Sequence, residues 1–259
     1  MTDTLLFTDP GGMTQRIHVR VAQQIGLSIM RGDVQPGQSL PAELRLCEML
    51  SISRTAVRDA LRLLVGKGLI ESRPKSGTKV RAQEHWNYLD ADVLRWQLEL
   101  TDTDTYLTKL FDLRRAVEPA ASALAAASAN NADADRILAA FEAMAGANSN
   151  QAFVDADVEF HKSIYFATHN ELFWPIAQML ETALRESFRI SAPGSHRKRA
   201  IEEHRELMQA VCGRDPERAH AATVRLLGNS AKDVSAIRRS GQGEKHGQGA
   251  GAKMEREAG

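Results

Sequence analysis

The sequence predicts a mainly α-helical protein of two domains, with one small β-hairpin at the end of the first domain. Apolar residues recur every three or four positions along most of the 259 residues, as they do in amphipathic helices. Runs typical of short strands occur only at 69–72 and 78–81, around a Pro/Ser/Gly turn. The length allows two cores, and no apolar run approaches the roughly 20 residues that span a bilayer.

The formal net charge of zero is a cancellation between two regions. Residues 14–83 carry 12 Lys and Arg against 5 Asp and Glu, a net charge of +7, and the region 84–237 is correspondingly acidic. This asymmetry favours a basic first domain with a polyanionic partner. We expect a flexible start (1–13), a basic domain (14–83) and a helical connector (84–103). An all-helical domain (104–236) and a disordered Gly-rich tail (237–259) should follow.

The two cysteines, Cys47 and Cys212, lie far apart and show no CxxC spacing. We expect both to be buried small hydrophobic residues in a reducing compartment. The first residues, "MTDTLLFTDPGGM", have no basic region and no long apolar run, so they do not read as an export signal. The sequence therefore predicts a cytoplasmic protein with no membrane partner.

The elements of the first domain follow one another in a recognisable order. Helical spacing predicts helices at 14–31, 42–50 and 54–67, and Gly and Pro residues in "GDVQPGQ" separate the first two. Ser53 is placed to cap the third helix, which Gly68 ends before the hairpin. Three helices with a short turn before the last, followed by a hairpin, predict a winged helix-turn-helix.

The third helix, "RTAVRDALR", places Arg54, Arg58 and Arg62 on one stripe, where like charges repel. One interpretation is a solvated charged face; the other is a face that meets duplex DNA. In a helix-turn-helix the first residues of this helix, here with Ser53 and Thr55, reach base edges in the major groove. The +7 charge and the basic hairpin, with Arg73, Lys75 and Lys79, favour DNA.

The connector and the second domain show helical spacing throughout. Trp86, Leu89, Val93 and Trp96 predict a connector that docks on a neighbouring surface. Beyond it, polar breaks near 130–131, 147–150, 192–195 and 213–215 divide a run of helices.

Arg114 occupies an apolar stripe of the second domain, in a seam formed by Leu107, Leu110, Val117, Ala121 and Leu124. A guanidinium that faces a core needs an anion. Either Arg114 pairs with an acid such as Glu118 or Asp157, or it holds the carboxylate of a ligand.

A second polar group also lies on apolar helical faces. Asp157 and His161 are neighbours at i and i+4 beside Phe153, Phe160 and Ile164, and His204 lies beside Ile201, Met208 and Val211. These residues are either hydrogen-bonded core side chains or ligands of a divalent transition metal such as zinc. Three protein ligands would leave coordination positions open for water or for the oxygens of a ligand.

Several segments resemble a known family. "PGQSLPAELRLCEMLSISRTAVRDALRLLVGKGLIESRPKSGTKV" resembles the winged helix-turn-helix of GntR-type bacterial regulators. "DLRRAVEP", "DVEFHKSIYFATHN", "EEHRELMQAV" and "RDPERA" resemble the helical FCD effector domain of the FadR subfamily. The connector "HWNYLDADVLRWQLE" is similar to that of galactonate-responsive repressors and related sugar-acid regulators. The resemblance covers about residues 14–235.

The resemblance implies a homodimeric repressor that leaves its operator when a small carboxylate, such as an aldonate, binds the helical domain. It implies an effector pocket with Arg114 and Arg185, and a metal site of one Asp and three His that maps onto Asp157, His161 and His204. The family's third His falls at Leu226 here, and Leu44 replaces a frequent Arg. The implied DNA contacts are Arg45, Ser53, Arg54, Thr55, Arg58 and the wing from Lys75 to Gly77.

Two other classes of protein compete with this interpretation. A metal-dependent enzyme could use Asp157, His161 and His204, but the sequence contains no HExxH, no Gly-flanked nucleophile and no P-loop. An effector-free nucleoid-type DNA binder would have no use for a pocket arginine. We therefore expect a regulator and not an enzyme.

Overall fold

The structure is a computed structural model that describes residues 17–73, 77–190 and 197–233. It divides into two compact units, Met1–Thr103 and Asp104–Gly259, called here the N-terminal unit and the helical unit. The predicted mainly α-helical fold is confirmed, and within the described ranges the strands form a single hairpin. The segments predicted to be flexible, 1–13 and 237–259, lie outside the described residues.

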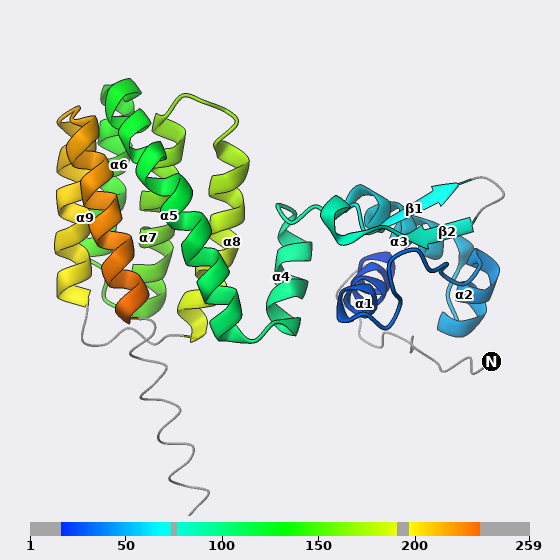
Figure 1. Ribbon diagram of the computed structural model, residues 1–259. Helices are drawn as coiled ribbons and strands as arrows, with labels where there is room; N and C mark the ends of the chain where they lie inside the picture. The colour runs from blue at the N-terminus through cyan, green and yellow to red at the C-terminus, as the bar shows by residue number, and fades with distance from the viewer. Residues whose placement is uncertain (1–16, 74–76, 191–196, 234–259) are drawn as a thin grey trace, which may run out of the picture. The chain divides into compact units, whose positions relative to one another are not determined.

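The N-terminal unit contains the predicted three helices and hairpin (Figure 1). Its elements are α1 (Ile17–Arg31), α2 (Glu43–Leu50), α3 (Arg54–Gly66), β1 (Ile70–Arg73) and β2 (Gly77–Val80). The two strands are antiparallel, with Ile70 opposite Val80. Apolar residues of all three helices and the hairpin form one core, including Ile25, Leu46, Leu50, Val57 and Leu64. This core fixes α3 with one face inward and the other in solvent.

The connector joins that same core. After a short 3₁₀ helix (Gln83–His85), α4 (Ala91–Leu100) begins where the Asp90 carboxylate accepts the backbone N–H groups of Asp92 and Val93. The prediction of helical spacing from Trp86 onward is therefore wrong before Ala91, and Leu89 lies outside the helix and is exposed. Docking is nevertheless observed, because Trp86, Val93 and Trp96 are buried in the core of the N-terminal unit.

Gly26 allows α4 to pack closely on α1. The Trp96 ring lies directly against this position, and a Cβ atom on Gly26 would overlap it. Trp96 is only 4% exposed. Gly26, which has no side chain, thus accommodates Trp96, one of the two tryptophans of the connector.

The helical unit is a bundle of helices that run side by side (Figure 1). It comprises α5 (Thr103–Ser128), α6 (Asn131–Ala145), α7 (Asn150–Ala167), α8 (Trp174–Ile190), α9 (Arg197–Cys212) and a further helix over residues 216–233. Breaks occur near three predicted positions, while the predicted break at 192–195 lies outside the described residues. An unpredicted break at 168–173 contains no Gly or Pro; there His169 adopts a positive φ of 50° and contacts the buried Asp133 at 2.7 Å.

The expected seam on α5 is only partly correct. Leu107, Leu110 and Ala121 are buried, whereas Leu124 is 43% exposed. Leu124 lies 17 positions after Leu107, about 4.7 helical turns, so the two side chains diverge by roughly 100°. Cys47 and Cys212 are free thiols but only partly buried, which corrects the expectation of full burial.

No helix in the described part of the chain is long and apolar enough to cross a membrane.

Candidate functional site

The turn between α2 and α3 exposes the first residues of α3. Ser51 takes up a left-handed conformation with φ 54°, and its N–H reaches the carbonyl groups that end α2. The Ser53 hydroxyl then accepts the N–H of Ala56 at 3.2 Å, which is the predicted N-cap. Since Val57 points into the core, the residues at the start of α3 that face solvent are Ser53, Arg54, Thr55 and Arg58.

Acidic side chains hold two of the three arginines on the exposed stripe of α3. Arg58 Nε donates to Glu43 Oε2 at 2.8 Å, and this hydrogen bond raises the pKa of Arg58. Arg62 donates to Asp59 at 3.1 Å. Arg54 has no acidic partner among the described residues. The stripe therefore presents Arg54 directly and Arg58 through an exchangeable surface ion pair.

The remaining predicted DNA contacts lie on α2 and at the hairpin. Arg73 donates to Glu71 at 3.1 Å and lies opposite Gly77, which has a positive φ of 76°. Arg45 is exposed on α2 and donates to Glu48 at 3.2 Å. Lys75 lies outside the described residues.

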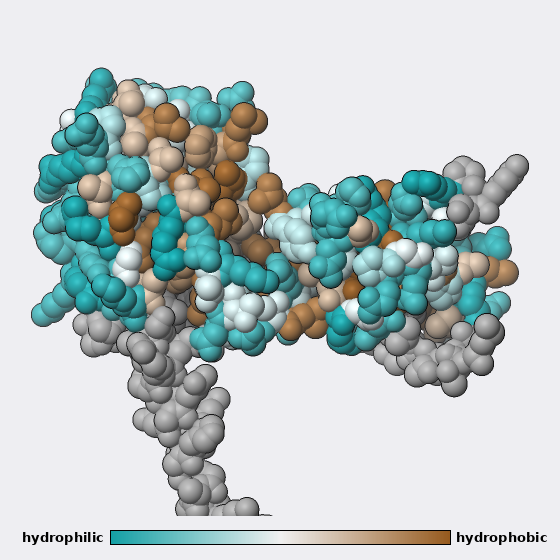
Figure 2. Space-filling model, in the orientation of Figure 1, coloured by the Kyte–Doolittle hydropathy of each residue, from teal (hydrophilic) through white to brown (hydrophobic). Residues whose placement is uncertain are grey.

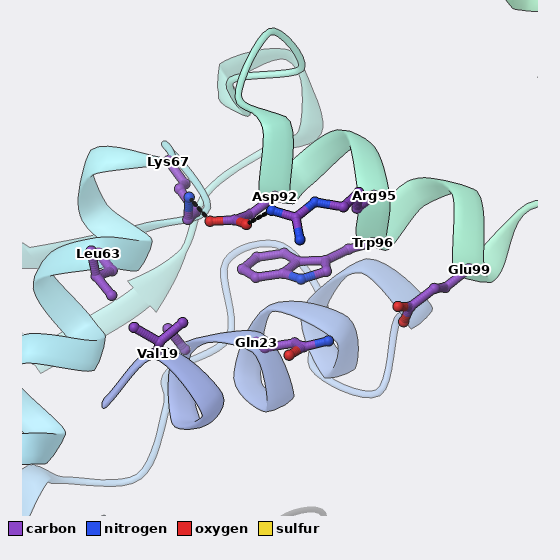
Figure 3. Close-up of a pocket in the computed structure, with 9 residues that line it drawn as sticks. Val19, Gln23, Leu63, Lys67, Asp92, Arg95, Trp96 and Glu99 are labelled. Carbon is purple, nitrogen blue, oxygen red and sulfur yellow. Dashed lines mark hydrogen bonds and ion pairs between the residues drawn. The ribbon is translucent and has the colours of Figure 1, made fainter. Parts of the chain in front are cut away.

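A buried lysine joins the end of α3 to the start of α4, as Figure 3 shows. Lys67 Nζ lies 2.7 Å from Asp90 Oδ1 and 2.7 Å from Asp92 Oδ2, and 5.7 Å from the centre of the Trp96 ring. Burial would lower the pKa of Lys67, but the two aspartates outweigh burial and raise it. Asp92 also pairs with Arg95 at the surface. The sequence pattern gave no sign of this contact, because its partners are 23 and 25 positions away.

In the helical unit, α5, α7 and α9 bring together five charged or polar side chains, each at most 5% exposed. They are called here the polar cluster: Arg114, Glu118, Asp157, His161 and His204. The i, i+4 spacing on α5 and on α7 places two members of the cluster on one face of each helix. The structure thus joins Arg114 to the three predicted metal ligands through an acid between them.

That acid is Glu118. Arg114 Nε donates to Glu118 Oε1 at 2.6 Å, and His161 Nδ1 donates to Glu118 Oε2 at 3.2 Å. Burial would raise the pKa of Glu118, but Arg114 and His161 outweigh burial and lower it to about 2. Of the two acids considered as partners for Arg114, the structure therefore selects Glu118.

Three acceptor atoms converge on the other side of the histidines. His204 Nδ1 donates to the Ala200 carbonyl at 2.7 Å, so each imidazole directs Nδ1–H toward an acceptor. His204 Nε2 then lies 2.8 Å from Asp157 Oδ1 and 3.3 Å from His161 Nε2. The lone pairs of these three atoms would repel one another at such distances. A cation shared between them, either a proton or a metal ion, is therefore needed. Burial would lower the pKa of His204, and Asp157 outweighs burial and raises it.

The donor set fits a divalent transition metal. The ligand atoms of Asp157, His161 and His204 all lie within 4.8 Å of one another. Ligands about 2.1 Å from a tetrahedral zinc ion are separated by about 3.4 Å, close to the 3.3 Å between the two Nε2 atoms. Acceptors on both Nδ1–H groups are the usual outer partners of metal-binding histidines. Leu226, at the position of the family's third His, is buried and apolar.

Arg185 lies apart from these contacts. It pairs with Asp155 and, at 3.3 Å, with Glu181, and its side chain is 40% exposed. The described residues therefore place Arg185 in a surface ion-pair network rather than in the polar cluster.

Together, a basic winged helix-turn-helix and an all-helical domain define a DNA-binding regulator. Residues 17–80 match the family model of bacterial regulatory proteins, gntR family, and residues 109–229 match the FCD domain. The chain belongs to the gntR family of bacterial regulatory proteins and carries an FCD domain.

Its relatives agree with this assignment. The galactonate operon transcriptional repressor of Escherichia coli K12 is 30% identical over 221 residues, covering 84% of this chain and 96% of the relative. The Glc operon transcriptional activator of the same strain is 29% identical over 228 residues, covering 83% and 88%. The solved structure of Lar, which controls expression of the Listeria monocytogenes agr system, shares the fold, with a TM-score of 0.59, 15% identity and coverage of 87% and 99%. This chain is a DNA-binding transcriptional regulator.

Proposed function

We propose that this regulator represses sugar-acid catabolic genes and leaves its operator when a small carboxylate binds the polar cluster. The carboxylate would be held by Arg114 and by a divalent metal on Asp157, His161 and His204. The observation that carries the proposal is the convergence of these three ligand atoms beside a buried arginine. The name of the galactonate operon repressor supports a sugar acid as the effector class.

The metal would supply a Lewis acid that binds carboxylate or hydroxyl oxygens of the effector. The chain's own residues prepare the site around it. Glu118 accepts the hydrogen bond from Nε of Arg114, so the Nη1 donors of the guanidinium would be available to a ligand. Glu118 also orients His161. Leu226 provides no ligand atom, which leaves one coordination position for the effector.

The DNA-binding half of the proposal assigns Arg54 and Thr55 to base edges in the major groove. Arg58 would exchange Glu43 for DNA, and Arg45, Arg73 and the wing would contact phosphates. We propose that two chains act together on a palindromic operator in the cytoplasm. Figure 2 shows apolar residues gathered over α5 and its neighbours, and exposed Leu113 and Leu124 on α5 are consistent with an interface between two copies.

We expect Arg54→Ala and Arg58→Ala each to weaken specific operator binding by about 5-fold to 150-fold, because a lost base contact costs about 1–3 kcal/mol. Fluorescence anisotropy with labelled operator DNA measures the loss, and circular dichroism checks that the fold is kept. Arg115→Ala is the matched control, since Arg115 is an exposed arginine paired with Asp112 on α5. Unchanged operator affinity in both α3 variants would contradict the assignment of α3.

Metal removal should separate effector response from DNA binding. We expect the chelated protein to keep its operator affinity but to need at least about ten-fold more sugar acid for release, and zinc should restore the response. Elemental analysis should find a bound metal in the wild type and little in Asp157→Asn. Asp155→Asn serves as control, because Asp155 pairs with Arg185 at the surface. A metal-free wild type that responds normally would exclude the metal, and conversion of the sugar acid to a product would favour an enzyme.

A further inference from the structure

Tyr165 contains a buried hydroxyl group for which the protein supplies no partner. The residue is 2% exposed, and its hydroxyl oxygen has no hydrogen bond within the described part of the chain. The buried serine and threonine hydroxyl groups that the structure describes in the helical unit are, by contrast, all bonded. Ser163 donates to the Phe160 carbonyl at 2.7 Å, and Thr223 donates to Ser122 at 2.8 Å. A phenylalanine at position 165 would avoid the cost of an unpaired buried hydroxyl. The presence of a tyrosine there therefore calls for a reason.

The position of Tyr165 connects it to the polar cluster. It follows His161 by four residues and Asp157 by eight on α7, so the three side chains lie on one face of this helix. The charges of Glu118 and Arg114 both act on the phenol, and burial and Glu118 raise the pKa of Tyr165. The phenol therefore remains protonated and can donate a hydrogen bond near the guanidinium.

We propose that Tyr165 is an effector-binding residue whose phenolic O–H donates to a carboxylate oxygen of the ligand held by Arg114. This inference rests on the proposed function. It adds a donor that the predicted site residues do not include. The Arg114 guanidinium and the Tyr165 hydroxyl would form a pair of donors for one carboxylate, while the acceptor capacity of Glu118 is occupied by Arg114 and His161. A ligand with an anionic oxygen acceptor fits this arrangement, and a neutral sugar does not.

The test compares wild type, Tyr165→Phe and Ser163→Ala in zinc-loaded, full-length protein. The probes are galactonate, gluconate and lactate, and calorimetry measures the affinity of the acid that the wild type binds most tightly. We expect Tyr165→Phe to bind that acid about ten-fold or more weakly, with unchanged operator affinity. Without ligand it should unfold at the same or a higher temperature, because it loses only an unpaired hydroxyl. Ser163→Ala loses a bonded hydroxyl and should keep the affinity of the wild type.

Each result decides between clear alternatives. Equal affinity in wild type and Tyr165→Phe would overturn the role of Tyr165 and leave the proposed function standing. Lower thermal stability of ligand-free Tyr165→Phe, with unchanged affinity, would show a structural hydroxyl instead. If none of the three acids binds the wild type, the proposed function fails, and the role of Tyr165 fails with it.

Discussion

Replacing Glu118 with alanine should lower the unfolding free energy of the helical unit by about 3–5 kcal/mol, the usual cost of removing one partner from a buried ion pair. The reason is that Glu118 accepts from both Arg114 and His161 and is only 2% exposed. Without it, a buried guanidinium would have no anion at hydrogen-bonding distance. Urea denaturation followed by circular dichroism measures the loss.

Two controls isolate the charge effect. Asp112→Ala removes an acid from the same helix, but the Asp112–Arg115 pair is exposed and should contribute less than about 1 kcal/mol. The double variant Arg114→Met/Glu118→Leu removes both charges and should recover most of the stability, since an apolar replacement of a buried pair is often neutral or stabilising. If Glu118→Ala is no less stable than Asp112→Ala, the ion pair does not stabilise the bundle.

Lys67→Met should weaken the docking of α4 on the other helices of the N-terminal unit. The substitution keeps an apolar chain of similar length but removes the ammonium group that Asp90 and Asp92 share. Two partly buried carboxylates then face each other, and we expect a loss of about 3 kcal/mol. Hydrogen exchange of residues 91–100 should become much faster than in the wild type, because their docked state would be populated less.

The control for this prediction is Arg95→Ala, which removes the half-exposed arginine that pairs with Asp92. It should leave the exchange of α4 nearly unchanged. Slow exchange of residues 91–100 in Lys67→Met would show that packing of Trp96 on α1 is sufficient to hold the connector.

The sequence predicted those features that depend on neighbours along the chain. The Ser53 cap, the position of α3 and the i, i+4 placement of Asp157 and His161 on α7 follow from patterns of neighbouring residues, and all are found. Spacing could not decide between Glu118 and Asp157 as the partner of Arg114, because that choice depends on how three helices pack. The unpaired hydroxyl of Tyr165 gave no sequence signal, since a tyrosine and a phenylalanine fit the same apolar stripe.

Longer-range contacts were missed for the same reason. The Lys67 contact joins residues more than 20 positions apart, and His169 reaches Asp133 across 36 positions. The end of α7 coincides with that second contact and with a left-handed His169, and the Pro175 in the first turn of α8 was the one local signal for this break. The start of α4 at Ala91 follows from the Asp90 cap, which a purely apolar pattern ignores.

The packing of Trp96 against Gly26 has a practical consequence for chimeric regulators. Trp86, Val93 and Trp96 complete the core of the N-terminal unit, so a DNA-reading module cut after the hairpin would lose part of its own interior. Sensor domains exchanged between members of the family should therefore be joined at residues 101–103, after α4, where the chain leaves that core. The connector would then remain part of the DNA-binding half of the chimera. An incoming sensor domain would have to act on the connector and the DNA-binding helices together.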